Sequence, residues 1–239
     1  MNEVEIQTET ETFYPPRKHD FSISFGMLLG FVVTFLSLGV VSGIVIGITN
    51  SLIDLDIILI ATGFYGLLLD ALMFIIAILL FKKVRQFSFA KFDFAPMKLG
   101  KTYLYLVVSF ILLFISQYLF IGLLQMDDSS QQYDTLGGNL VGDHWINYLL
   151  FYFALVVITP IKEELLFRGL FLRFFEEKYN FWIGLILSAL IFGLLHVDYP
   201  LSAITMGAIL GGLYKKTNSI VPPTILHMSW NLIAAMTII

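Results

Sequence analysis

Long apolar runs, separated by short polar segments, follow one another along most of the chain. A membrane-spanning helix needs about 20 consecutive apolar residues to cross a hydrocarbon core that is roughly 30 Å thick. The runs that meet or approach this length lie at about 25–49, 57–81, 102–124, 145–173, 181–197 and 201–214, and in the stretch that follows Pro222-Pro223. The pattern predicts an all-α fold, a polytopic transmembrane helical bundle with about seven spans, in a range of about six to eight.

Two regions of different character divide the chain. Residues 1–24 are polar and acidic-leaning, and they contain the basic pair Arg17-Lys18 ahead of the first apolar run. This composition predicts a polar tail without fixed structure on the cytoplasmic side. Residues 25–239 leave room for a single transmembrane bundle and for no second globular domain.

The composition identifies the class of protein. Hydrophobic residues make up 58% of the chain and charged residues 13%, and the mean hydropathy is +0.85. Soluble domains carry about 25% charged residues, so we expect an integral membrane protein surrounded by the lipid bilayer. No basic stripe is present, which argues against nucleic acid as a partner. The chain has no cysteine, which excludes disulfides, thiolate metal ligands and a cysteine nucleophile.

The charges between the apolar runs alternate in sign along the chain. Basic residues concentrate in the segments 82–101, 168–178 and 215–216, and the intervening segments 50–56, 125–144 and 198–200 are acidic or neutral. Because loops rich in Lys and Arg stay on the cytoplasmic side, we expect a multi-pass protein of the cell membrane with a cytoplasmic N-terminus. Seven spans would then place the C-terminus outside.

Charged residues inside the apolar runs need an explanation, because each Glu or Arg near the bilayer centre costs about 2.5–3.5 kcal/mol on insertion scales. Asp70 stands alone in the second run, and we expect it to make interior hydrogen bonds or packing contacts rather than to take part in catalysis. The stretch from Glu163 to Arg168 differs, since it places two adjacent carboxylates and a guanidinium within six residues.

Helical geometry assigns different partners to the two glutamates. Residues four apart share a face of a helix, so Glu164 and Arg168 are expected to form an ion pair. Glu163 points elsewhere, without a basic partner in its own helix, and can project into a shared cavity as a general base. Pro160 cannot donate a backbone hydrogen bond and should loosen or kink the helix just ahead of this position.

Two later apolar runs carry the other polar residues that could do chemistry. Phe192 and His196 are four apart near the end of the fifth run, and His227 and Asn231 are four apart in the last run. Each pair can present both side chains to one side of its helix. Together with Glu163 they predict a polar site within the membrane, in its cytoplasmic half.

These residues form three spaced motifs, in the order Glu163-Glu164-x-x-x-Arg168, Phe192-x-x-x-His196 and His227-x-x-x-Asn231. The set resembles the three motifs of the CPBP intramembrane proteases, a family that includes the CAAX prenyl endopeptidases and the bacterial bacteriocin-immunity (Abi) proteins. The resemblance covers about 145–239, the expected protease core. It implies peptide-bond hydrolysis, with catalytic positions at Glu163, His196, His227 and Asn231 and supporting positions at Glu164, Arg168 and Phe192.

Two mechanisms are compatible with these residue types. In the first, Glu163 and His196 activate a water molecule while His227 and Asn231 stabilise the oxyanion. In the second, the candidate ligands Glu163, His196 and His227 hold a divalent metal such as zinc, which activates the water. Asparagine is a poor zinc ligand and a good oxyanion donor, which favours the mechanism that requires no cofactor.

The resemblance favours an endopeptidase that cleaves a membrane-associated peptide or protein near the cytoplasmic face, in CAAX-type or bacteriocin-immunity-type processing. Two other classes stay open. A non-proteolytic membrane scaffold or regulator would have no need for a base, two histidines and an amide. An ion or proton carrier would use Asp70, Glu163 and the histidines as a relay, but the two halves of the chain show no inverted repeat.

Overall fold

The computed structural model describes residues 22–52, 63–128, 130–142 and 144–238 of the chain. Within these ranges the chain forms helices joined by turns, and it contains no β-strand. The all-α fold predicted from the apolar runs is confirmed. The predicted tail, 1–24, lies outside the described residues except for positions 22–24, which precede the first helix.

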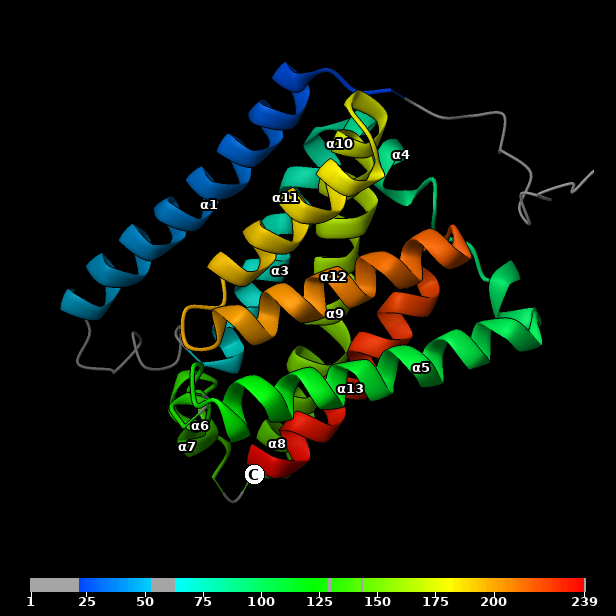
Figure 1. Cartoon of the computed structure of the whole chain (residues 1–239). Helices are drawn as coiled ribbons and strands as arrows, with labels where there is room; N and C mark the ends of the chain where they lie inside the picture. Colours follow the sequence, from blue (N-terminus) through cyan, green and yellow to red (C-terminus); the bar gives the residue numbers. More distant parts are fainter. Residues whose placement is uncertain (1–21, 53–62, 129, 143, 239) are drawn as a thin grey trace, which may run out of the picture.

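Each predicted span contains one or more helices (Figure 1). The first part of the chain forms α1 (Phe25–Leu52), α3 (Phe64–Leu80), α4 (Lys82–Phe89), η1 (Ala95–Lys98), α5 (Gly100–Gln117) and η2 (Tyr118–Leu123). Two short helices follow, α6 (Gln132–Thr135) and α7 (Gly138–Val141). The last part forms α8 (Trp145–Tyr152), η3 (Phe153–Ile158), α9 (Thr159–Glu164), η4 (Leu165–Leu172), α10 (Arg173–Lys178), α11 (Phe181–Leu194), α12 (Pro200–Thr217) and α13 (Val221–Ile238).

The apolar helices are those of an integral membrane protein. Two helices of the described chain are long and apolar enough to cross a membrane by themselves, α1 and the 24-residue helix that α5 forms with η2. The pair α3 and α4 would make a third span if taken together, but it is bent by 110°. The total number of spans, and the assignment of residues 25–239 to one bundle, stay predictions.

The segments predicted as loops contain helices of their own. The basic segment 82–101 includes α4, which buries Val84 and Phe87 while its lysines remain exposed. α4 has only eight residues, fewer than a membrane span needs, and several of them are polar. A search for long apolar runs therefore does not detect it. The acidic segment 125–144 likewise includes α6 and α7.

Among the described residues, the basic segments gather at one end of the helices, around α4, α10 and the end of α12, and the described parts of the acidic segments lie at the other end, around α6, α7 and the start of α12 (Figure 1). At the basic end, Lys215 of α12 pairs with Glu176 of α10, and α4 packs against η4, which continues into α10. At the acidic end, the backbone N–H of Asp128 donates to the carbonyl of Asp198, at 3.1 Å. The alternation of charge along the sequence thus corresponds to a separation of charge in space.

A continuous helical stretch from α8 to α10 runs through the middle of the fold (Figure 1). Two parts of it, η3 and η4, are π-helical and lie on either side of α9. Pro160, near the start of α9, has no N–H to continue the α-helical hydrogen bonds. The π-helical turns just before it agree with the predicted loosening of the helix at this point.

Close packing holds the neighbouring helices against this stretch. A Cβ atom at Gly169 would lie 2.7 Å from the carbonyl oxygen of Ser88 in α4, so glycine allows the two backbones to meet. α11 packs along α12, and the carboxylate of Asp127 caps α12 by accepting from the backbone N–H groups of Leu201 and Ser202, at 3.2 and 2.6 Å. The turn between α11 and α12 is therefore held by the packing of the two helices and by the contact of Asp127 with the start of α12.

Candidate active site

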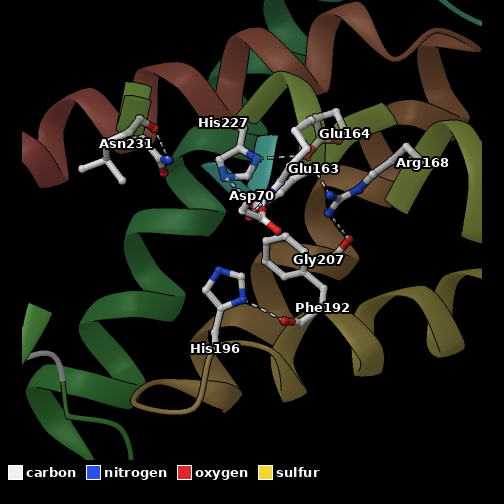
Figure 2. A network of polar contacts seen from close by, with 11 residues as sticks. Asp70, Glu163, Glu164, Arg168, Phe192, His196, Gly207, His227 and Asn231 are labelled. Carbon is white, nitrogen blue, oxygen red and sulfur yellow. Dashed lines mark hydrogen bonds and ion pairs between the residues drawn. The ribbon is translucent and has the colours of Figure 1, made fainter. Parts of the chain in front are cut away.

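Three parts of the chain bring the predicted site residues together around the end of α9 (Figure 2). α9 and η4 supply the two glutamates and Arg168, and α13 supplies His227 and Asn231. Phe192 lies in α11, and His196 lies in the turn after it, two residues beyond the last helical residue, Leu194. Contacts between α13 and α9, and between α11 and η4, hold these elements side by side.

The predicted ion pair between Glu164 and Arg168 is present and fully buried. Arg168 Nη1 donates to Glu164 Oε1 at 2.7 Å, and the two side chains are 1% and 0% exposed. Arg168 Nη2 also donates to the carbonyl oxygen of Gly207 in α12, at 3.0 Å, and the guanidinium lies 5.1 Å from the centre of the Phe192 ring. One arginine thus joins η4 to α9, α11 and α12.

His227 lies between the two glutamates. Its Nδ1 is 3.0 Å from Glu164 Oε1, and its Nε2 is 3.7 Å from Glu163 Oε2. Because an ionised carboxylate only accepts hydrogen bonds, this contact assigns the proton to Nδ1 and directs Nε2 toward Glu163. Glu164 therefore orients His227 as well as pairing with Arg168, a role that no sequence spacing indicates across 63 positions.

His196 has one ring nitrogen bound and one left for another partner. Its Nδ1 is 2.7 Å from the carbonyl oxygen of Phe192, so Nδ1 carries the proton and Nε2 is an acceptor. The Phe192 ring packs on His196 with 4.5 Å between ring centres and lies 6.0 Å from the ring of His227. Among the described residues no hydrogen bond or ion pair joins His196 directly to Glu163.

Asn231 lies one turn beyond His227 on α13, and Figure 2 shows its amide directed at a backbone carbonyl. Its Nδ2 donates to the carbonyl oxygen of Leu155 in η3, at 2.9 Å. An asparagine amide has two N–H donors, so this bond fixes the side chain and leaves a second donor.

Lys162 and Asp70 extend the site in a way that the sequence analysis missed. Lys162 Nζ contacts the Asp70 carboxylate of α3, and it lies 3.9 Å from Glu163 Oε1. The expectation that Glu163 has no basic partner in its own helix is therefore wrong, because the preceding residue supplies one. Asp70 makes the hydrogen bond expected of it, but its side chain is 42% exposed in the structure, so the expected interior position is not found.

The candidate metal ligands Glu163, His196 and His227 have suitable donor atoms. Zinc sites need three or four such donors about 2 Å from one point. Across the part of the chain that the structure describes, no group of three or more His, Asp or Glu side chains is arranged to hold a metal ion.

Comparison with known proteins places these motifs in a family. The profile described as "Type II CAAX prenyl endopeptidase Rce1-like" matches residues 145–233, which contain all three motifs. The "UPF0177 protein YbdI" of Lactococcus lactis subsp. lactis (strain IL1403) is 30% identical over 172 residues, which are 71% of this chain and 92% of that protein. The "Putative membrane peptidase YdiL" of Bacillus subtilis (strain 168) is 34% identical over 77 residues, or 31% of this chain and 32% of that protein.

No solved structure gives a significant match. The lactococcal relative is similar along nearly its whole length, and the profile match covers the segment that builds the polar site. The chain belongs to the CPBP family of membrane proteases, as the three motifs indicate.

Proposed function

We propose that this chain is an intramembrane endopeptidase that hydrolyses a peptide bond of a membrane-associated peptide or protein. One observation carries the proposal, the placement of Glu163 Oε2 3.7 Å from His227 Nε2 in a site supported by a buried ion pair. A carboxylate and an imidazole that face each other can move a proton and stabilise charge.

Glu163 is the proposed general base. It accepts a proton from a water molecule whose oxygen attacks the carbonyl carbon of the scissile bond, and His196 Nε2 is a second acceptor that orients the water. When the C–N bond breaks, the proton on Glu163 passes to the leaving amine. The products are then a carboxyl group on one fragment and an amine on the other.

The oxyanion that forms on attack needs hydrogen-bond donors, and His227 and Asn231 are the proposed ones. Asn231 retains a free N–H while its other N–H is bound to Leu155. In the proposed reaction His227 carries a proton on both ring nitrogens throughout, so Nε2, which lies 3.7 Å from Glu163 Oε2, donates a hydrogen bond to the oxyanion and keeps its proton. The proton taken from water stays on Glu163 until it passes to the leaving amine. None of these steps requires a metal ion or another cofactor.

The proposed substrate is processed near the cytoplasmic face, in a CAAX-type or bacteriocin-immunity-type reaction. The family profile that matches is named for CAAX prenyl endopeptidases, which supports a substrate that is anchored in the membrane. The proposed orientation, with a cytoplasmic N-terminus in a multi-pass protein of the cell membrane, follows from the basic end of the fold.

Quantitative mass spectrometry of membrane peptides tests this function in cells that carry wild-type protein or Glu163→Ala. We expect a membrane peptide or protein to accumulate uncleaved in the Glu163→Ala cells, with normal levels of the variant protein. Glu176→Ala is the matched control, because it removes a carboxylate that pairs with Lys215 outside the site. Identical peptide profiles for wild type and Glu163→Ala would support a scaffold instead.

A further inference from the structure

Lys162 is held at the site by a residue from a distant part of the chain. It lies in α9 immediately before Glu163, its side chain is 12% exposed, and its ammonium group pairs with Asp70 of α3. α3 packs against both α9 and η3, so the pair joins two helices that meet beside the catalytic carboxylate. The mechanism proposed above does not use either residue.

The two oxygens of Glu163 face different partners. Oε1 lies 3.9 Å from Lys162 Nζ, and Oε2 lies 3.7 Å from His227 Nε2. A lysine ammonium is a mobile point charge on a flexible stem. Asp70 holds this charge near the Glu163 oxygen that is not the one closest to His227, at a distance longer than a direct hydrogen bond.

We infer that Lys162, tethered by Asp70, is a positioning residue for Glu163: it keeps Oε1 turned toward the ammonium and Oε2 toward His227 and the reacting water. The inference rests on the proposed function, since it assigns a role toward the proposed base. Without Asp70, the ammonium is free to bind the Glu163 carboxylate directly and to turn it away from His227. Without Lys162, Glu163 Oε1 has no other ion-pair partner among the residues that the structure describes.

Single substitutions show whether the pair affects turnover. We expect Lys162→Met and Asp70→Asn each to lower cleavage in the membrane-peptide assay by about 10- to 100-fold, the cost of small displacements of a reacting group. Lys162→Arg keeps the positive charge, and we expect its guanidinium to contact both Asp70 and Glu163, so it should retain most of the activity. The double variant Asp70→Asn/Lys162→Met should be little worse than either single variant, because coupled partners are not additive.

The charge swap Asp70→Lys/Lys162→Asp distinguishes a role in orienting Glu163 from a role in stabilising the fold. The swap restores an ion pair between α3 and α9, so we expect thermal stability in detergent close to that of the wild type. It also puts a carboxylate beside Glu163 where the ammonium was, so we expect cleavage to stay at least 10-fold reduced. Two single variants are measured in the same experiment: Lys162→Met should lose cleavage activity, and Lys162→Arg should retain it.

Recovery of cleavage in the swapped variant, or undiminished cleavage by Lys162→Met, would overturn the inference while the proposed function stands. A swapped variant that is unstable leaves the decision to Lys162→Arg, which must then be far more active than Lys162→Met. If wild type and Glu163→Ala do not differ in the same assay, the proposed function fails and the inference fails with it.

Discussion

At the residue scale, the buried Glu164 carboxylate is the acceptor around which the site is built. Its Oε1 takes hydrogen bonds from both Arg168 and His227, at 2.7 and 3.0 Å. Arg168 in turn reaches the backbone of α12 through Gly207. The position of the proposed oxyanion donor His227 therefore depends on a fully buried ion pair.

Removal of the guanidinium should destabilise the protein. Arg168→Ala leaves the Glu164 carboxylate buried without its cation, a change that typically costs about 3–5 kcal/mol. For a chain of this length that corresponds to a fall in Tm on the order of 10 °C. Thermal unfolding of the purified variant in detergent measures the change, and lower protein yield should accompany it.

Lys215→Ala is the control for this measurement. Lys215 also pairs with a glutamate, Glu176, but its side chain is 51% exposed. Exposed pairs contribute about 0–1 kcal/mol, so Tm should stay close to the wild-type value. Equal Tm values for Arg168→Ala and wild type would contradict the structural role given to the buried pair.

The sequence was sufficient to predict contacts between residues of one helix, but not contacts between residues of different helices. The Glu164–Arg168 pair follows from a spacing of four, and the structure contains it. The contacts of Lys162 with Asp70 and of Glu164 with His227 join residues 92 and 63 positions apart. No periodicity relates such positions, although a lone acid and a lone lysine inside apolar runs are a signal that they pair with each other.

At the scale of elements, apolar runs predicted where helices occur but not how they bend. The predicted spans contain helices because every backbone group inside a bilayer must be hydrogen-bonded within the chain. α4 was not predicted because it is short and is bent by 110° relative to α3. Its place in the fold is set by Arg173, which donates to the Phe87 carbonyl at 2.7 Å and packs on the Phe87 ring.

The π-helical turns beside α9 have a consequence for the site. Pro160 predicted a disturbance in the helix, and η3 is that disturbance. Within η3, the Leu155 carbonyl accepts the hydrogen bond from Asn231. The irregular backbone therefore provides the anchor for a side chain that comes from another helix, a link that the sequence motif alone does not contain.

At the scale of the whole molecule, the separation of charge between the two ends of the helices supports one orientation in the membrane. The end that carries Lys215 and α4 should face the cytoplasm, and the end that carries Asp128 and Asp198 should face outward. The proposed site would then receive a substrate that is anchored in the membrane and approaches from the cytoplasmic side.

Cysteine labelling tests this orientation, because the chain has no cysteine of its own. Phe92→Cys and Ser130→Cys introduce thiols at exposed positions of the basic and acidic ends. In intact cells, an impermeant thiol reagent should label Ser130→Cys and leave Phe92→Cys unlabelled until the membrane is permeabilised. The reverse pattern would contradict the proposed orientation.

Cleavage of a peptide by purified protein tests the proposal that the chain itself hydrolyses a peptide bond. The substrate is the peptide that accumulates in Glu163→Ala cells, and the reaction is run in water enriched in ¹⁸O. Samples of wild type, Glu163→Ala and wild type treated with 1,10-phenanthroline are analysed together by mass spectrometry. The treated sample tests the proposal that no metal takes part, and zinc-dependent recovery of its activity would contradict that proposal.

The decisive reading is the mass of the new C-terminus in the wild-type reaction. We predict one ¹⁸O atom from solvent in the newly formed carboxyl group with wild-type protein, and no cleavage with Glu163→Ala, because Glu163 is the proposed base that activates the attacking water. Cleavage at equal rates by both proteins, or no cleavage by purified wild type, would contradict the account.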